Sequence, residues 1–187
     1  KKEIEVTTLE DAVKYARKMG YPLVMKVVGP LHKSDVGGVV LNITDEETVI
    51  NEFNRLIKIK DTYAVEICPM LFGTEVFIGA AKEENFGHQI LFGLGGVFVE
   101  VMKDVHTTLA PVNKEEAKSL IYKLKGYKIL EGIRGNEPVN IDKFAELVAR
   151  ISALVMAAPE IAEMDLNPLL ATSKAIVAVD ARIRVEK

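Results

Sequence analysis

Apolar residues recur at helical intervals in four stretches of this 187-residue chain. Thr7, Thr44 and Asn113 each precede a glutamate by three positions, which is the spacing of a capped helix start. These signals predict helices over 8–19, from Thr44 to about Ile57, from Asn113 to about Leu124, and over 141–157.

Shorter apolar or alternating runs predict strands. The run 21–28 is nearly all apolar and is bounded by glycines, which indicates a strand buried on both faces. The other predicted strands cover 39–43, 63–68, 74–82, 88–92, 97–102, 161–170 and 175–183. The four strands between 63 and 102 are separated by turn residues, which predicts one antiparallel sheet, and the last two form a hairpin. Residues 125–138 are expected to be a connector, and the fold class is therefore α+β.

The composition is that of an ordinary globular protein, with 49% hydrophobic and 27% charged residues. A formal net charge of -3 shows no basic excess for nucleic acid or an anionic membrane. The single cysteine, Cys68, excludes an internal disulfide and a cysteine-based zinc site. No apolar run reaches the roughly 18 residues of a membrane span, and the first residues lack the apolar stretch of a secretion signal. We therefore expect a cytoplasmic protein that binds neither nucleic acid nor membranes.

Glycines cluster in the run Phe92-Gly93-Leu94-Gly95-Gly96-Val97, between two predicted strands. Backbone N–H groups of such a loop can close around phosphate oxygens, because no Cβ keeps the ligand away. The run lacks the ending of a P-loop and precedes a strand, so it is not a Rossmann fingerprint either. A structural turn or bulge is the alternative interpretation.

Two side chains near the first long strand are candidates for phosphate chemistry. Lys26 stands in the apolar run, where an ammonium costs free energy unless it meets an anion or snorkels to solvent. His32 follows in the loop His32-Lys33-Ser34-Asp35, which ends in two glycines. It is a candidate phosphoryl carrier or acid–base group, although a loop histidine can also be a solvated surface residue. His88 and His106 have weaker context and are expected to be structural.

Oxygen-bearing side chains face each other across the last predicted hairpin. If its loop is Thr172 to Ala175, Asn167 lies opposite Asp180, and Asp165 lies two residues along on the same face. Carboxylate and amide oxygens suit Mg²⁺. The alternative is a polar face in solvent, and a register shift of one residue would separate the pair.

Glu66 and Glu75 bracket the turn at 69–73. A carboxylate can accept hydrogen bonds from two ribose hydroxyls, and the backbone at a strand end can bind a purine edge. Most glutamates at strand edges simply face water, so this pair is open to either interpretation.

Together these segments resemble the ATP-grasp family, and most closely the beta (nucleotide-binding) subunit of ADP-forming acyl-CoA synthetases, in the succinyl-CoA synthetase superfamily. The resemblance spans nearly the whole chain. Its motifs are, in order, Gly20-Tyr21-Pro22 with Lys26, the loop from His32 to Val39, Gly73-Thr74-Glu75-Val76, Phe92 to Glu100, Leu130-Glu131-Gly132 with Arg134-Gly135, and Glu163 to Pro168 with Asp180-Ala181-Arg182.

The resemblance implies an ATP-grasp fold of two α+β lobes, 1–62 and 63–187, with the nucleotide site between them. It also implies a role for each candidate residue. Lys26 would contact the ATP phosphates, Glu66, Ile67 and Cys68 would form the adenine hinge, Glu75 would hold the ribose, Gly93, Gly95 and Gly96 would line the nucleotide site, and Asn167 and Asp180, with Asp165 beside them, would hold Mg²⁺.

The implied reaction is acyl-CoA + ADP + phosphate ⇌ acid + ATP + CoA, with phosphate relayed through phosphohistidine. A histidine of an alpha subunit carries the phosphate, and in ADP-forming acetyl-CoA synthetases a second histidine in the HKSD loop of the beta subunit takes part. His32 matches that second histidine. The partner alpha subunit would carry the CoA-binding and phosphohistidine sites, because this chain has no CoA-binding Rossmann fingerprint, and the enzyme would be a hetero-oligomer.

Two other ATP-grasp functions are alternatives. One is a non-catalytic regulatory module, against which the intact Lys26, His32, Asn167 and Asp180 argue. The other is a carboxylate–amine ligase that uses an acyl phosphate without phosphohistidine, and the histidine loop argues against it. The role of Glu131 and Arg134 stays open.

Overall fold

The computed structural model describes residues 3–30, 33, 35–96, 104–133 and 135–186. They form two compact units, divided between Leu71 and Phe72. In chain order the elements are β1 (Ile4–Val6), α1 (Leu9–Met19), β2 (Leu23–Val28), β3 (Val39–Ile43), α2 (Glu46–Leu56), β4 (Ala64–Pro69), β5 (Thr74–Glu83), β6 (Gly87–Leu94), β7 (Val105–Leu109), α4 (Lys114–Ile121), α5 (Tyr127–Leu130), α6 (Ile141–Ala157), β8 (Ile161–Ala171), β9 (Ile176–Ala178) and β10 (Arg182–Val185).

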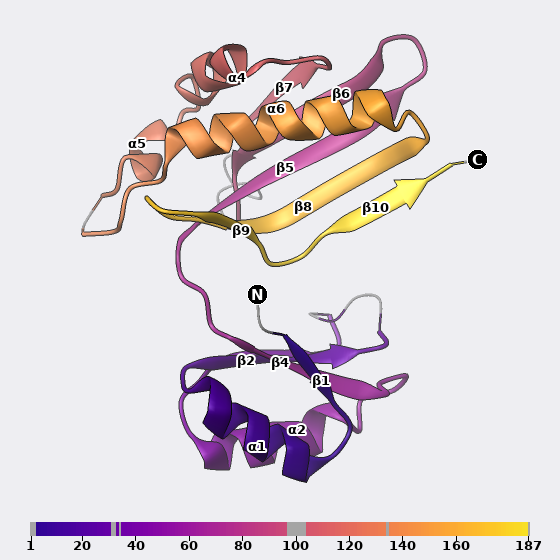
Figure 1. Cartoon of the computed structure of the whole chain (residues 1–187), viewed down its shortest axis with the longest axis vertical. Coiled ribbons are helices and arrows are strands. Elements are labelled where there is room, and N and C mark those ends of the chain that lie inside the picture. The colour runs from indigo at the N-terminus through magenta and orange to yellow at the C-terminus, as the bar shows by residue number, and fades with distance from the viewer. Residues whose placement is uncertain (1–2, 31–32, 34, 97–103, 134, 187) are drawn as a thin grey trace. The chain divides into compact units, whose positions relative to one another are not determined.

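The first unit is an antiparallel sheet in the order β1-β4-β2-β3, with α1 and α2 on one face (Figure 1). Alternate residues of β2, Leu23, Met25 and Val27, are fully buried against the helices, as the pleat requires. Phe53 of α2 and Ala16 of α1 lie in the same core. The core fixes β2, and with it the position of Lys26.

The position of β4 differs from the prediction. We expected residues 63–68 to pair with the strands that follow, in a lobe that begins at residue 63. The strand instead lies between β1 and β2, with Val65 paired to Val6 and to Val27. The first unit therefore continues to Leu71, and the expected boundary at residue 62 lies inside it. Local periodicity predicted the strand, but its partners are distant in sequence.

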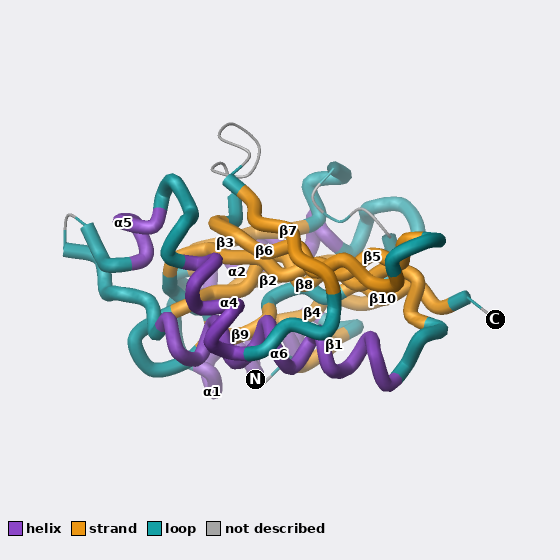
Figure 2. Tube along the Cα trace, turned by 90° about the horizontal axis from the view of Figure 1, so that it is seen from above, coloured by secondary structure: helices purple, strands orange, loops and turns teal. Residues whose placement is uncertain are grey.

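The second unit is a larger antiparallel sheet in the order β10-β8-β5-β6-β7, with β9 also paired to β8. Helices α4, α5 and α6 lie on one face, and α4 and α6 run side by side there (Figures 1 and 2). Phe92 of β6 and Phe144 of α6 meet edge to face in this core, with ring centroids 6.3 Å apart. No helix of the described residues of this unit lies on the opposite face of the sheet.

The predicted helices are present, and two of their starts lie one residue later than expected. The Asn113 side chain accepts a hydrogen bond from the Glu116 amide at 2.9 Å, and α6 covers the predicted 141–157. Thr8 and Asp45, and not Thr7 and Thr44, cap α1 and α2. Because two adjacent residues can each supply an acceptor oxygen, the sequence does not fix which of them caps the helix.

Three elements were not predicted, and one predicted strand is divided. The unpredicted elements are the short strand β1, the strand β7 and the one-turn helix α5. The expected strand 175–183 consists of β9 and β10, separated at 179–181. The expected strand 97–102 lies outside the described residues. No helix among the residues described is long and apolar enough to cross a membrane.

Candidate functional site

Lys26 and Glu66 are cross-strand partners in the first unit. They are paired in the ladder between β2 and β4, and Lys26 Nζ lies 3.8 Å from Glu66 Oε1. Only 12% of the lysine side chain and 15% of the glutamate side chain are exposed. The ammonium expected to need an anion therefore has one within its own sheet.

This ion pair leaves hydrogen-bonding capacity unused. Glu66 Oε1 is buried and has no hydrogen-bond partner among the described residues. A separation of 3.8 Å is too long for a hydrogen bond between ammonium and carboxylate. An acceptor buried without a donor costs free energy, so the site suits a ligand that brings an N–H or O–H to Glu66 and an anion to Lys26. A nucleotide offers both kinds of group.

Ile67 and Cys68 follow Glu66 on β4. Both side chains are buried, with at most 3% of either residue exposed. Any contact of these two residues with a purine would therefore use backbone N–H and C=O groups. This is consistent with the hinge role that the resemblance implies for them.

His32 and Arg134 lie outside the described residues. The end of the histidine loop is described, and it is held firmly. The Gly38 amide donates to Lys33 O at 2.7 Å, the Val27 amide donates to Gly38 O at 2.8 Å, and Arg55 Nη1 of α2 donates to Gly37 O at 3.0 Å. Sequence analysis gave no role to Arg55. Arg55 also forms an ion pair with Glu52, and the spacing of three residues between them is the only sequence feature that could have indicated this contact.

In the second unit, Glu75 and the glycine run lie together. The Gly95 amide donates to Glu75 O at 2.7 Å. A Cβ on Gly95 would stand 3.1 Å from the Glu75 backbone, and a Cβ on Gly96, where φ is +60°, would collide with Oε2 of Glu75. Two features predicted separately therefore form one cradle, which a side chain would fill.

Gly93 has a different setting from its two neighbours. It lies within β6, paired with Phe77 of β5 and Val105 of β7, and a Cβ there would strike the carbonyl oxygen of Asp104. The expected strand 88–92 thus continues through Gly93 to Leu94. The close approach of the neighbouring strand explains this glycine without a ligand.

The predicted register of the last hairpin is confirmed. Ala171 pairs with Ile176 at the loop end, and Asp165 pairs with Arg182 beyond the gap between β9 and β10. The Val179 amide donates to Pro168 O at 3.0 Å within the gap, so no register slip intervenes. In this register Asn167 lies opposite Asp180.

The charges of Asp180 and Arg182 both act on the Asp165 carboxyl. Desolvation raises the pKa of the Asp165 carboxyl above its ordinary value, Arg182 opposes the change, and the negative charge of Asp180 adds to it. Two carboxylates and an amide oxygen form a hard-oxygen set, and a divalent cation would relieve the repulsion between the carboxylates. The donor set therefore fits Mg²⁺.

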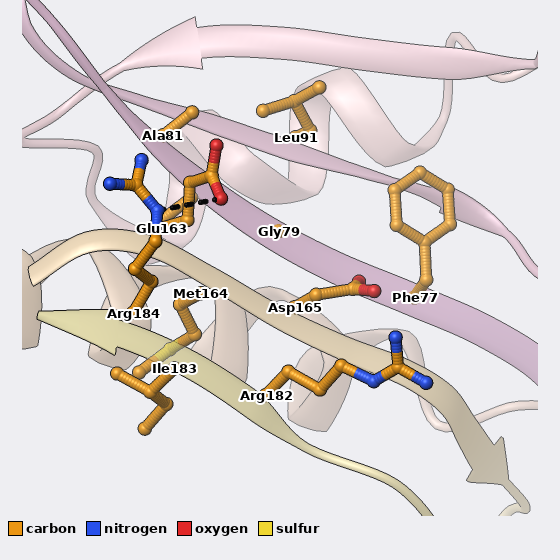
Figure 3. A pocket seen from close by; sticks show the side chains of 11 residues that line it. Phe77, Gly79, Ala81, Leu91, Glu163, Met164, Asp165, Arg182, Ile183 and Arg184 are labelled. Atoms are coloured by element: carbon orange, nitrogen blue, oxygen red, sulfur yellow. Dashed lines mark hydrogen bonds and ion pairs between the residues drawn. The ribbon is translucent and has the colours of Figure 1, made fainter. Parts of the chain in front are cut away.

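A hollow of about 540 Å³ adjoins these residues. It lies on the sheet face opposite the helices, since its lining includes alternate residues of β5 and β8 (Figure 3). Phe77, Gly79 and Leu91 give it an apolar floor, and Asp165 and Arg182 give it a charged rim. The arrangement can hold a flat apolar group beside an anion.

Asp104 is a buried residue that sequence analysis missed. It is 4% exposed, and its carboxylate accepts hydrogen bonds from the backbone amides of Lys125 at 2.8 Å and Gly126 at 2.7 Å. It thereby joins the start of β7 to the connection between α4 and α5. Nothing in its local sequence distinguishes it from a surface aspartate. His88, expected to be structural, is buried with Nε2 2.6 Å from Ile161 O.

Comparison with known proteins gives the family. The ATP-grasp domain family matches residues 2–185. The beta subunit of ADP-forming acetate–CoA ligase I from Pyrococcus furiosus is 42% identical over 184 residues, which cover 93% of this chain and 79% of that subunit. The ADP-forming acetate–CoA ligase II of Archaeoglobus fulgidus is 44% identical, and there the match covers 95% of this chain and 27% of the longer protein.

Solved structures agree with this assignment. Dinucleotide-forming acetyl-coenzyme A synthetase 1 of Ca. Korarchaeum cryptofilum, in complex with coenzyme A and Ca-AMPCP, has a TM-score of 0.88 and 38% identity, over 99% of this chain and 85% of that one. A second structure of that protein, with Mg-AMPPCP and its phosphohistidine segment pointing towards the nucleotide binding site, has a TM-score of 0.80 and 40% identity, over 98% and 85% of the two chains. The chain therefore belongs to the ATP-grasp family, and within it to the beta subunits of the ADP-forming acetate–CoA ligases.

Proposed function

We propose that this chain is the nucleotide-binding subunit of an ADP-forming acyl-CoA synthetase and makes ATP from ADP as acyl-CoA is converted to acid and CoA. The observation that carries the proposal is the hairpin register, in which Asn167 faces Asp180 with Asp165 on the same side. A surface hairpin does not require three oxygen donors together, one of them a carboxyl whose pKa desolvation raises. The relatives named as ADP-forming ligases support this function over a regulatory module or a carboxylate–amine ligase.

Groups that suit a nucleotide occur in both units. In the first unit, Lys26 binds phosphate oxygens, Glu66 accepts a hydrogen bond from the nucleotide, and the backbone of Ile67 and Cys68 meets the purine. In the second unit, Glu75 holds the ribose hydroxyls beside Gly95 and Gly96. Gly93 lets the neighbouring strand approach and so keeps this cradle in position.

Asp165, Asn167 and Asp180 hold Mg²⁺ in this proposal. When bound, the ion neutralises negative charge on the phosphates of the nucleotide. The residues of the chain then serve to position the nucleotide and to exclude competing groups. Phosphoryl transfer needs little more from a protein than positioning and charge stabilisation.

His32 is the phosphoryl carrier of this subunit. In the last step the bond between phosphorus and the imidazole nitrogen breaks, and its electron pair returns to the ring. A bond forms between phosphorus and a terminal oxygen of ADP, and the freed nitrogen takes up a proton from water, so the products are ATP and a neutral imidazole ready for the next cycle. The contacts of Gly37 and Gly38 with Arg55, Lys33 and Val27 hold the end of the loop that carries this histidine.

The chain acts together with an alpha subunit that carries the CoA-binding site and the first phosphohistidine. Beta-subunit names among the relatives support a partner of this kind. A hetero-oligomer and a cytoplasmic location complete the proposal.

A phosphate-transfer assay tests it. The full-length chain is mixed with its alpha subunit, acyl-CoA, ³²P-phosphate, Mg²⁺ and ADP, and acid-labile protein phosphate and ATP are measured for wild type and His32→Ala. We expect wild type to make ATP and the variant to stall with label on the alpha subunit. Normal ATP formation by the variant would exclude His32 as the carrier. Binding of ATP–Mg²⁺ without ATP formation by wild type would favour the regulatory module.

A further inference from the structure

Arg182 lies among the candidate metal ligands without being one of them. It stands on β10 directly across from Asp165, and its Nε lies 3.8 Å from Asp180 Oδ2. Its side chain is 59% exposed and lines the hollow on the open face of the sheet. In Figure 3, Asp165 and Arg182 extend the same way, towards Phe77. A guanidinium therefore borders the site proposed for Mg²⁺.

The contact with Asp180 does not occupy this guanidinium. At 3.8 Å and with both side chains more than half exposed, the ion pair is of the weak surface kind. Arg has five N–H donors in a rigid fork that matches phosphate oxygens. Arg182 therefore has donors to offer a ligand in the hollow.

Two cations beside the same carboxylates repel one another unless an anion lies between them. If Asp165 and Asp180 held Mg²⁺, an anionic group shared by the ion and the Arg182 guanidinium would reduce the repulsion between these two cations. In the proposed reaction that group is a phosphate. Of the phosphates, the transferred phosphoryl group would be stabilised most by Arg182, because negative charge develops on its oxygens and a fixed hydrogen-bond donor stabilises that charge.

Arg184 shows that this is not a property of every arginine on the strand. It lies two residues along on the same face and is 53% exposed. Its Nε is 3.1 Å from Glu163 Oε2, and its Nη1 contacts Glu186. Figure 3 shows it directed towards Glu163, so its charge is already shared by two carboxylates.

We propose that Arg182 is a catalytic residue whose guanidinium contacts the terminal phosphoryl group of the bound nucleotide, which is the group that is transferred. This inference rests on the proposed function and adds a residue to which we have assigned no role. The guanidinium stays protonated throughout. It donates hydrogen bonds to the phosphoryl oxygens while the bond between phosphorus and the ADP oxygen forms and the bond to the phosphoryl donor breaks.

Nucleotide binding gives a test that does not depend on turnover. Affinities for ADP and for AMPPCP, each with Mg²⁺, are measured by calorimetry on the full-length chain for wild type, Arg182→Ala, Arg182→Lys and Arg184→Ala. We expect Arg182→Ala to weaken AMPPCP binding about tenfold or more and ADP binding much less, because only AMPPCP carries the terminal phosphoryl group. Arg182→Lys keeps the charge but not the fork, so its loss should be intermediate.

Turnover gives the second readout. In the complex with the alpha subunit, Arg182→Ala should lower kcat for ATP formation on the order of 100-fold or more, with little change in the KM for ADP. Arg184→Ala, the matched control, should leave both nucleotide affinities and kcat near wild type.

The outcomes separate this inference from the proposed function. If Arg182→Ala weakens both nucleotides equally, or neither, the contact with the terminal phosphoryl group is wrong. Equal effects of Arg182→Ala and Arg184→Ala would show that the loss of a positive charge, and not a specific contact of Arg182, causes the change. That outcome would also overturn the inference. If wild type makes no ATP with its alpha subunit, the proposed function fails, and the ratio of AMPPCP to ADP affinity still decides whether Arg182 binds that group.

Discussion

Nζ of Lys26 lies 3.8 Å from Oε1 of Glu66, a buried oxygen without a hydrogen-bond partner among the described residues. Desolvating two charges is costly, and a pair without a hydrogen bond recovers only part of that cost. The first unit therefore retains an arrangement that is not optimal for its own stability. Such an arrangement is expected where a ligand completes the polar contacts.

Removing only one member of this pair should destabilise the first unit. Lys26→Met leaves the Glu66 carboxylate mostly buried without a counter-charge, so the free energy of unfolding should fall by about 1–3 kcal/mol. The double variant Lys26→Met with Glu66→Gln should lose less, because no unpaired charge remains. Urea unfolding of both variants measures the difference, with Arg17→Ala, which removes an exposed pair with Glu46, as the control. A double variant less stable than Lys26→Met would contradict this account.

Gly96 should tolerate alanine less well than Gly87, although both have positive φ. Alanine at either position meets the same kind of backbone strain, about 1–2 kcal/mol. Around Gly87 there is no atom within 4 Å of an added Cβ, whereas at Gly96 the Cβ would displace the Glu75 carboxylate. We expect both variants to lose similar stability and only Gly96→Ala to lose nucleotide affinity. Calorimetric titration with ADP–Mg²⁺ measures the affinity, and an equal loss in Gly87→Ala would exclude a local effect on Glu75.

Asp165 should reduce stability at neutral pH. Because its folded-state pKa is raised, the folded protein binds the proton more tightly, and stability falls as pH rises from the ordinary aspartate pKa through the folded one. Asp165→Asn should therefore raise the melting temperature near neutral pH, with the gain vanishing in acid, and it should weaken Mg²⁺ binding.

Asp45 provides a control of opposite sign. Its pKa is lowered mainly by the hydrogen bond from the Thr48 amide, so its stabilisation is present above the ordinary aspartate pKa and is lost as pH falls. Asp45→Asn should lower the melting temperature near neutral pH. Thermal unfolding across pH compares the two variants, and a loss of stability at neutral pH in Asp165→Asn would show that desolvation does not dominate at Asp165.

Asp104 should be essential to the stability of the second unit. Asp104→Asn places an N–H₂ group where one oxygen accepts from a backbone amide, so a buried donor loses its partner. The expected cost is about 1–3 kcal/mol, whereas Asp142→Asn, on the surface of α6, should change stability little. Hydrogen exchange at the Lys125 and Gly126 amides checks the mechanism. Unchanged protection of both amides in Asp104→Asn would be evidence against it.

Local signals in the sequence were sufficient for most elements and for the hairpin. Helix α6 and the pairing of Ala171 with Ile176 follow from periodicity and a short loop, both of which depend on neighbouring residues. The sheet partners of β4 could not be predicted in this way, because β1 and β2 lie far from β4 in the sequence. The predicted helix caps shifted by one residue where two polar residues compete for the position.

The residue types of the candidate site could be predicted from the sequence, but most of the contacts that these residues make could not. Pattern alone proposed Lys26, Glu75 and Asn167 as candidates, since each is an unusual residue for its place or part of an ordered motif. It could not reveal that Glu66 is the counter-charge of Lys26, because that contact depends on the sheet partners of β4. The contacts of Asp104 with the Lys125 and Gly126 amides likewise depend on long-range packing.

The gap at 179–181 preserves the register between β9 and β10, and this limits how the chain can change in length. Deleting or inserting a single residue there would turn each residue of β10 to the other face of the sheet. Arg182 would then leave the side of Asp165. Natural length variation in this interval should therefore come in steps of two residues.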